Sequence, residues 1–324
     1  MAGNITTRII GTGSYAPETV VTNADLMEFM DTNDAWIRER TGICERRISV
    51  SEGTSDLAVQ AAKAAMENAG IDPLAIDIII VATSSPDRSF PSAATDVQGI
   101  IGASNAVAFD ITAACSGFIY ALHIANGFIK SGIYKTGLII GAETLSKVLD
   151  WTDRSSSILF GDGAGAAVVQ ADETGMIHAL MGSDGTKGWV LECQARSLGN
   201  CLTKVKPELG LMKMDGQEVF KFAVKKVPEI VKKVMEESGT VQEDVKYFLL
   251  HQANIRILES ASRRLKIPMD KIPINIERYG NTSAASIPIL LDELNRAGKI
   301  NRGDKLVMAG FGAGLTWGAV LLEW

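Results

Sequence analysis

The stretch FDITAACSGFIYAL, residues 109 to 122, runs from a strand-like segment through a cluster of small residues into a helical segment. Cys115 stands at this junction, with only alanine, serine and glycine as its close neighbours. Such small neighbours permit a tight turn between strand and helix and the close approach of a substrate. A strand that leads directly into a helix is also a building unit of a layered α/β fold.

The rest of the chain alternates in the same way, which predicts a layered α/β protein with a largely parallel sheet. The helical segments are rich in small residues, and the two clearest helices each end at a glycine, as a helix C-terminus often does. The clearest strands are residues 77–84, 136–143, 163–170, 246–252 and 305–312, and the clearest helices are residues 58–70 and 218–239.

Two pairs of similar segments indicate that the chain is internally duplicated. MENAG begins at Met66 and MEESG at Met235, an offset of 169 in the numbering, and similar strands follow both segments. Further on, residues 131–142 resemble residues 297–310 at an offset near 166. Two matches in the same order with nearly equal offsets predict a repeat of about half the chain.

This repeat predicts an N-terminal half of residues 1–172 and a C-terminal half of residues 173–324. Offset 169 puts His251 at the carboxyl end of a strand, where open α/β sheets usually bind their ligands. Offset 166 aligns Asn281 with Cys115. We therefore expect Cys115 of the first half to face His251 and Asn281 of the second half.

Each of these three residues has a catalytic and a structural interpretation. The free N–H groups and the positive dipole end of a helix stabilise a thiolate, so the position of Cys115 is expected to lower its pKa and make it a nucleophile. A free cysteine is as often a small buried apolar residue. His251 could be a hydrogen-bonded structural histidine, and Asn281 could be the N-cap of a helix.

Composition narrows the class of protein. The 324 residues carry a net charge of −6, which argues against a nucleic-acid binder. The N-terminus lacks the pattern of a signal peptide, and no apolar run reaches the roughly 18 residues that span a membrane. Four cysteines without C-x-x-C spacing and three scattered histidines favour reduced thiols and argue against a metal site. We expect a soluble cytoplasmic protein that binds neither nucleic acid nor membrane.

Two glycine patterns could suggest a NAD-dependent oxidoreductase. GTGSYA at residues 11–16 and GDGAGA at residues 161–166 both fit G-x-G-x-x-[GA]. A dinucleotide site requires a helix to open within the motif. The first pattern runs into a proline and an extended segment and the second into a strand-like segment, so neither is expected to bind a dinucleotide.

With these residues in place, the chain resembles the β-ketoacyl-acyl-carrier-protein synthase III family, the thiolase-fold initiating enzymes of bacterial fatty-acid synthesis. The matching motifs cover nearly the whole chain. They are GTGSYAPE, TNADL, DTNDAWIRERTGICERR, AACSGF, ILFGDGAGAAV, HQANIRI, YGNTSAAS and FGAGLTWGAVLLEW. The resemblance implies a thiolase-like five-layered αβαβα fold built from two duplicated βαβαβαββ halves.

The resemblance also implies a decarboxylative Claisen condensation between a short acyl-CoA and malonyl-acyl-carrier protein. Cys115 would hold the acyl group, and His251 and Asn281 would stabilise the enolate formed when carbon dioxide leaves. The backbone around Gly312 and Gly314 would complete an oxyanion hole with the N–H of Cys115. Coenzyme A enters as part of the substrate, and no metal or redox cofactor is implied.

Further residues match binding positions of the family. The coenzyme A positions are Thr32, Trp36, Arg40 and Arg154, the carrier-protein positions are Lys221, Arg256, Arg263 and Arg264, and Phe90 matches an aromatic residue that limits the acyl pocket across a homodimer. Trp36 and Arg154 also have a purely structural interpretation, and Arg263 and Arg264 could belong to a solvated charged face. The chain departs from the family at Ala313, usually a glycine, and at Gln217, usually an asparagine.

Other enzymes with this fold differ from the synthase III family in their catalytic residues. Elongating condensing enzymes use two histidines, and degradative thiolases carry a second cysteine in the C-terminal glycine loop, which FGAGLTWG lacks. A secondary-metabolic homologue with unusual acyl groups is the nearest alternative, and a non-catalytic thioester-binding scaffold is another. The intact Cys115, His251 and Asn281 argue against the scaffold. Straight and branched primers differ by one or two methylenes, so the sequence leaves the primer open.

Overall fold

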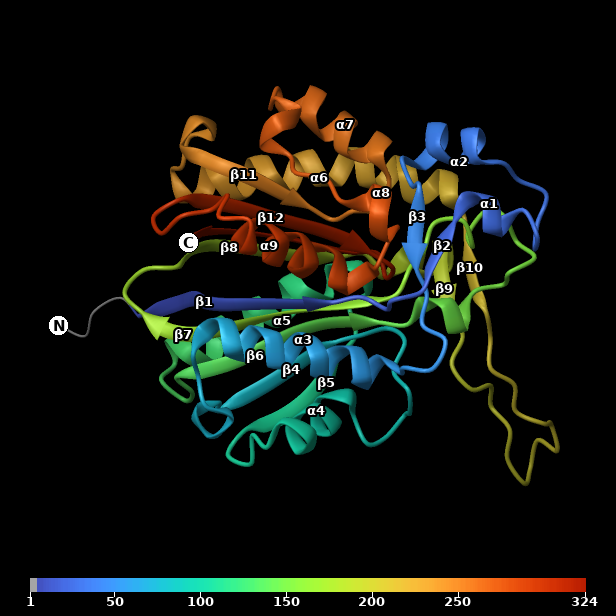
Figure 1. Cartoon of the computed structure of the whole chain (residues 1–324), viewed down its shortest axis with the longest axis horizontal. Helices are drawn as coiled ribbons and strands as arrows, with labels where there is room; N and C mark the ends of the chain where they lie inside the picture. Colours follow the sequence, from blue (N-terminus) through green and yellow to red (C-terminus); the bar gives the residue numbers. More distant parts are fainter. Residues whose placement is uncertain (1–4) are drawn as a thin grey trace.

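Two β-sheets lie at the centre of the molecule, one on each side of a pair of helices (Figure 1). The computed structural model describes residues 5–324. The first sheet has the order β1-β7-β6-β4-β5 and the second β8-β13-β12-β11. Their bounds are β1 Thr6–Tyr15, β4 Ile78–Ala82, β5 Val107–Ile111, β6 Thr136–Glu143, β7 Gly163–Asp172, β8 Met176–Ser183, β11 Val245–Leu250, β12 Lys305–Gly312 and β13 Thr316–Glu323.

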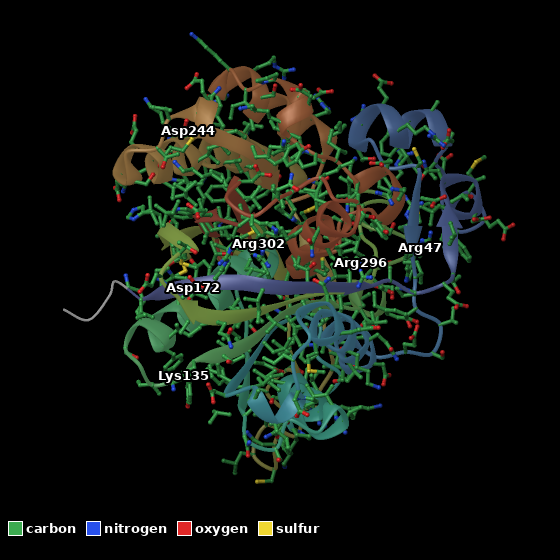
Figure 2. The ribbon with its side chains drawn as sticks, turned by 60° about the vertical axis from the view of Figure 1, so that its left-hand side comes forward. Arg47, Lys135, Asp172, Asp244, Arg296 and Arg302 are labelled. Atoms are coloured by element: carbon green, nitrogen blue, oxygen red, sulfur yellow. The ribbon has the colours of Figure 1, made fainter. Side chains whose placement is uncertain are left out.

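Helices complete the five layers that the family resemblance implies. Between the sheets, α5 (Gly117–Lys130) and α9 (Ser286–Arg296) pack their apolar residues against both. The outer face of the first sheet is covered by α3 (Thr54–Ala69) and α4 (Ala93–Ile101). The outer face of the second is covered by α6 (Gly216–Ser238) and α7 (Ile255–Leu265). The order αβαβα is therefore confirmed, and side chains fill the space between the layers (Figure 2).

Smaller elements form a cap beside the two sheets, visible at the right of Figure 1. They are β2 Val20–Thr22, α1 Asn23–Leu26, α2 Asp34–Thr41, β3 Glu45–Arg47, β9 Leu191–Cys193, β10 Met212–Met214 and α8 Ile276–Tyr279. The long connection between β9 and β10 extends away from the body of the molecule (Figure 1). Within residues 5–324, none of the helices combines the length and the apolar character that crossing a bilayer requires.

The duplication is visible in the structure as an offset of 169 in the numbering, which is constant from the ends of α3 and α6 to the starts of α5 and α9. Strand β12 begins at this offset from the start of β6. The 3-10 turn η7 (Ser283–Ala285) follows the 3-10 turn η2 (Ala114–Ser116) at the same offset. Both turns begin at a residue with an unusual positive φ, 45° at Ala114 and 49° at Ser283. Strand β7 of the first sheet ends at Asp172, which is labelled in Figure 2. The connection that follows it leads to β8, the first strand of the second sheet.

This constant offset corrects the alignment of Asn281 with Cys115. The residue that occupies the position of Cys115 in the second half is Ala284, in the middle of η7. The offset of 166 applies only near the end of the central helices, because α9 has 11 residues where α5 has 14. The connection after α9 is longer by the same amount, which restores the offset of 169 at β12.

Strand directions also differ from the expectation of a largely parallel sheet. Strand β4 is parallel to β5 and β6, and β11 is parallel to β12, but the other main pairs are antiparallel. Only three residues connect β12 to β13, too few for the crossover that parallel strands need. In the described chain the second half also has no counterpart of β5, and α8 lies at that point of the repeat.

The two glycine patterns lie where the sequence indicates. Residues 11–15 are part of β1, and residues 163–166 are part of β7. No helix opens within either motif in the described chain. The helix N-terminus that would bind a pyrophosphate is therefore missing at both places.

Candidate active site

Cys115 lies in the tight turn between β5 and α5, as the opening motif predicts. It is the middle residue of η2, one turn before α5 begins at Gly117, and its side chain is 8% exposed. Strand β12 passes directly beside it. A Cβ atom at Gly312 would lie 2.6 Å from the backbone nitrogen of Cys115, closer than real Cβ atoms approach. Glycine at this position therefore permits the contact between the two halves.

Burial changes the chemistry expected for this thiol. It raises the pKa of Cys115 to about 12, outweighing a hydrogen bond with the Ser283 side chain that acts in the opposite direction, and the charge of buried Glu143 adds to the rise. This rise is opposite in direction to the lowering that the helix start was expected to cause, because burial disfavours the charged thiolate.

His251 follows β11 and is held on several sides. His251 is 1% exposed, and its backbone N–H donates to the Ala309 carbonyl at 2.9 Å. In the side chain, Nδ1 lies 2.6 Å from Oγ of Ser286. The ring of Phe311 packs edge-on with a centroid distance of 5.3 Å. Nε2 is buried and has no hydrogen-bond partner among residues 5–324. Burial lowers the pKa of His251 to about 3, so the imidazole is neutral at physiological pH.

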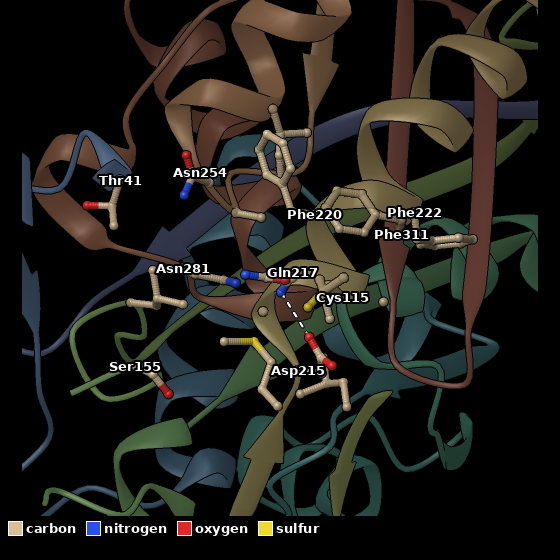
Figure 3. Close-up of a pocket in the computed structure, with 18 of the residues that line it drawn as sticks. Thr41, Cys115, Ser155, Asp215, Gln217, Phe220, Phe222, Asn254, Asn281 and Phe311 are labelled. Carbon is tan, nitrogen blue, oxygen red and sulfur yellow. Dashed lines mark hydrogen bonds between the residues drawn. The ribbon is translucent and has the colours of Figure 1, made fainter. Parts of the chain in front are cut away.

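Asn281 is 6% exposed and lies just before η7. Its Oδ1 accepts a hydrogen bond from the backbone N–H of Ser283 at 2.8 Å, but the N-cap residue of η7 is Thr282, so Asn281 is not a helix N-cap. Because that bond uses the oxygen, the amide nitrogen is the group available to a ligand. Figure 3 shows the side chain of Asn281 turned toward the part of the pocket where Cys115 lies.

These three residues line one pocket with a volume of about 1040 Å³. It opens between the cap and α6, and Figure 3 shows Phe220, Phe222 and Phe311 along one wall. Cys115, His251 and Asn281 therefore meet at the bottom of a single cavity, as the repeat predicts. Asn281 reaches the cavity even though it is not the residue equivalent to Cys115 in the second half. It does so because η7, which it precedes, lies against η2, the turn that contains Cys115.

The C-terminal glycine loop borders the same cavity. Gly312 lines the pocket beside Cys115, and Gly314 has a φ of +136°, which only glycine adopts easily. Ala313 is not among the residues with positive φ, so its methyl group causes no backbone strain. This departure from the family is compatible with the local conformation.

The residues expected to bind coenzyme A lie near the mouth of the pocket. Guanidinium groups of Arg40 and Arg154 lie over the ring of Trp36, at 5.0 and 5.4 Å from its centroid. Arg154 also donates to the carbonyl of Asp31 at 2.8 Å. Oγ1 of nearby Thr32 is buried without a hydrogen-bond partner in the described chain. Stacking of this kind suits a planar heterocycle.

The remaining predicted residues divide into two groups. Lys221 and Arg256 line the pocket mouth, and Gln217 lies there too, in the first turn of α6. Arg263 and Arg264 are exposed on the last turn of α7, outside the residues that line the cavity. Phe90 is 84% exposed and also lies outside the pocket.

Ser286, Asn254 and Phe220 are among the site residues that sequence reasoning missed. Ser286 contacts His251, although YGNTSAAS contains it in plain view. Asn254, from HQANIR, lines the pocket and donates from its amide to the carbonyl of Arg40 at 3.0 Å. Phe220 lines the wall that also contains Phe222 and Phe311. The position of both polar residues inside recognised motifs was the signal that could have identified them.

Fold and site together define a thiolase-like protein with a buried cysteine, histidine and asparagine. Residues 109–185 match the family model described as 3-oxoacyl-[acyl-carrier-protein (ACP)] synthase III, and residues 235–324 match the model of its C-terminal part. The β-ketoacyl-[acyl-carrier-protein] synthase III of Clostridium acetobutylicum is 54% identical over 98% of both chains. The chain belongs to the 3-oxoacyl-[acyl-carrier-protein] synthase III family.

Solved structures agree with this assignment. The crystal structure of 3-oxoacyl-[acyl-carrier-protein] synthase III from Aquifex aeolicus has a TM-score of 0.92 and 48% identity, over 98% of this chain and 100% of that one. The priming β-ketosynthase from the R1128 polyketide biosynthetic pathway also has a TM-score of 0.92, with 36% identity over 100% of this chain and 97% of that one.

Proposed function

We propose that this protein is an initiating β-ketoacyl-acyl-carrier-protein synthase, which condenses a short acyl-CoA with malonyl-acyl-carrier protein in fatty-acid synthesis. The observation that carries the proposal is the meeting of Cys115, His251 and Asn281 at the bottom of one pocket. The pocket provides a nucleophile and two polar side chains suited to stabilising an anion, which are the groups that this reaction needs.

In the first half-reaction Cys115 attacks the thioester carbonyl of the acyl-CoA. The sulfur of Cys115 forms a bond to the acyl carbon, the bond to coenzyme A breaks, and the thiol proton ends on the departing coenzyme A sulfur. The N–H of Cys115 and a backbone N–H of the Gly312–Gly314 loop stabilise the developing oxyanion. Attack requires the thiolate, which the positive end of α5 favours and which burial disfavours.

In the second half-reaction malonyl-acyl-carrier protein replaces coenzyme A. His251 through Nε2 and Asn281 through its amide nitrogen donate hydrogen bonds to the malonyl thioester oxygen. The carboxylate leaves as carbon dioxide, its bonding electrons form the enolate, and the enolate carbon attacks the acyl-Cys115 carbonyl. The thiolate of Cys115 leaves, and the product is a β-ketoacyl thioester on the carrier protein. Every reacting group comes from the chain and its substrates, so we propose that no metal or redox cofactor takes part.

Substrate binding uses the mouth of the pocket. The adenine of coenzyme A is proposed to stack between Trp36 and Arg154, with Arg40 and Thr32 beside it. Acidic carrier protein is proposed to dock on the positive charges of Lys221 and Arg256 and, farther along α7, of Arg263 and Arg264. We place this reaction in the cytoplasm, because the four free cysteines suit a reducing compartment.

A homodimer is part of the proposal. Strand β5 is the edge of the first sheet, with β4 as its sole neighbour among the described strands, and Val107 on it is 48% exposed. An unpaired edge of this kind can pair with another strand. Exposed Ile100 on α4 adds apolar area to the same side of the molecule, since α4 contacts β5.

Mass spectrometry of the intact protein tests the first half-reaction. We expect acetyl- or isobutyryl-CoA, but not octanoyl-CoA, to add one acyl group to the wild-type protein and none to Cys115→Ser. Addition of malonyl-acyl-carrier protein should then remove the adduct and release the β-ketoacyl product. If none of the acyl-CoAs gives a Cys115-dependent adduct, the initiating function is excluded.

A further inference from the structure

Arg46 is a fully buried arginine that the proposed mechanism does not use. It lies in β3 with no exposed surface, and none of the ion pairs among residues 5–324 includes it. Burial lowers the pKa of Arg46 to about 10, so the guanidinium is still charged at neutral pH. A buried cation without a carboxylate partner is costly to keep, so a particular role for its hydrogen bonds is expected.

The guanidinium of Arg46 connects three segments of the chain. Its Nη2 donates to Oδ1 of Asn23 and to the carbonyl of Ile158, both at 2.9 Å, and its Nη1 donates to the carbonyl of Val21 at 3.2 Å. Asn23 in turn donates to Oδ1 of Asp34 at 2.9 Å, in the first turn of α2, the helix of Trp36. Arg46 therefore joins the coenzyme A side of the pocket to the segment that begins at Ile158.

That segment holds the backbone of Asn281. The N–H of Asn281 donates to the carbonyl of Leu159 at 2.8 Å, and the N–H of Gly161 donates to the carbonyl of Asn281 at 3.1 Å. Both backbone groups of Asn281 are thus bound by residues 159–161. The stem of Arg46 packs on the same contact, because Cβ atoms added at Gly161 and Gly280 would lie 3.2 and 3.4 Å from its Cβ.

We propose that Arg46 is a positioning residue for Asn281, and that it acts on decarboxylation rather than on acyl transfer. The inference rests on the proposed function, in which only the second half-reaction uses Asn281. Arg46 fixes residues 158–161, these residues fix the backbone of Asn281, and the backbone sets the direction of its amide nitrogen. A displacement of about 1 Å at such a donor can lower a rate as much as a hundredfold.

The test compares Arg46→Lys with Arg47→Lys in the full-length protein. Lysine keeps the charge but lacks the planar fork that spans separate acceptors. Arg47 is the adjacent, half-buried arginine, marked in Figure 2, whose side chain pairs with Glu45 at 3.9 Å. Two rates are measured for each protein: acetyl transfer from acetyl-CoA to Cys115, and carbon dioxide release from malonyl-acyl-carrier protein on the acetylated enzyme.

We expect Arg46→Lys to slow carbon dioxide release by about tenfold or more while acetyl transfer stays within about twofold, and Arg47→Lys to change neither rate. Hydrogen exchange at the Asn281 amide should be faster in Arg46→Lys alone, because its bond to Leu159 is loosened. Equal slowing of both half-reactions, or no selective slowing, would overturn the proposal and leave Arg46 with a structural role only.

Asn281→Ala, assayed beside these variants, separates the proposal from the function on which it rests. If this variant retains normal carbon dioxide release, the proposed role of Asn281 is wrong and that of Arg46 fails with it. If Asn281→Ala is slow and Arg46→Lys is not, the function stands and only the role of Arg46 is rejected. Selective slowing in both variants supports both proposals.

Discussion

Oγ of Ser286 lies 2.6 Å from Nδ1 of His251, and this contact determines which imidazole nitrogen faces the pocket. Ser286 is buried in the first turn of α9, between the two sheets. The proposed role of His251 requires a proton on Nε2. In that tautomer Nδ1 is an acceptor, and the hydroxyl of Ser286 is the donor that satisfies it.

Replacing Ser286 with alanine should therefore impair the second half-reaction. Loss of the hydroxyl leaves Nδ1 buried without its partner, at a cost of about 1–3 kcal/mol, and removes the preference for the tautomer with Nε2–H. We expect carbon dioxide release to fall about tenfold, corresponding to about 1.4 kcal/mol, with acetyl transfer less affected. Ser286→Thr, which keeps the hydroxyl, should recover part of the loss, and exposed Ser131→Ala is the control. Equal rates for Ser286→Ala and wild type would contradict this role.

The pH dependence of decarboxylation follows from the burial of His251. Its pKa is lowered to about 3 because burial disfavours the charged imidazolium, so the neutral form needed for the reaction persists above that pH. Carbon dioxide release on the acetylated enzyme should show no acid limb from His251 between about pH 5 and 8. A limb near the ordinary histidine value of about 6.5, present in wild type and absent in His251→Asn, would show that the imidazole titrates normally.

The same burial makes Cys115 slow toward a small alkylating reagent. Burial raises its pKa to about 12, so thiolate is scarce at neutral pH and increases as the pH rises. Alkylation of Cys115 by iodoacetamide, followed by peptide mass spectrometry, should accelerate about tenfold per pH unit up to at least about pH 9. Exposed Cys201 serves as an internal reference in the same sample. A plateau for Cys115 below about pH 8 would indicate that the helix end outweighs desolvation.

The sequence predicted those parts of the fold that depend on local pattern. Apolar runs and glycine stops located strands such as β6 and helices such as α3 to within a few residues, since periodicity and capping are properties of neighbouring residues. Strand direction was not predictable in this way, because an apolar run has the same composition in a parallel or an antiparallel pair. The sheets are mixed as a result of short connections such as residues 313–315.

The site was predictable to a similar degree. The internal repeat correctly predicted that Cys115 and His251 lie in the same site. It aligned Asn281 with Cys115 incorrectly, because the shorter α9 changes the offset between the two halves only near the end of that helix. The contacts of Ser286 and Arg46 join residues far apart in the chain, and no spacing rule reveals them. The raised pKa of Cys115 depends on burial, which a motif does not report.

Dimerisation through β5 should be visible in solution. We expect light scattering to give about twice the 34.6 kDa mass of one chain, since the unpaired edge and the exposed apolar residues beside it favour pairing with a second copy. Val107→Asp, which places a charge on that edge, should shift the protein toward the monomer. Leu74→Asp, at another exposed apolar residue, is the matched control. A wild-type monomer at micromolar concentration would refute the homodimer.

A methyl group at Gly312 should damage acyl transfer. Its Cβ would lie 2.6 Å from the backbone nitrogen of Cys115 and 3.0 Å from Cβ of Ala114, so Gly312→Ala must push β12 and η2 apart. The N–H of Cys115 would then leave its place in the oxyanion hole, and we expect acetyl transfer to fall about a hundredfold. Gly127→Ala in α5 is the matched control, because an added Cβ there meets nothing within 4 Å and should stabilise the helix by about 0.5–1 kcal/mol. Normal acetyl transfer in Gly312→Ala would show that the close contact between the halves is not needed to orient the nucleophile.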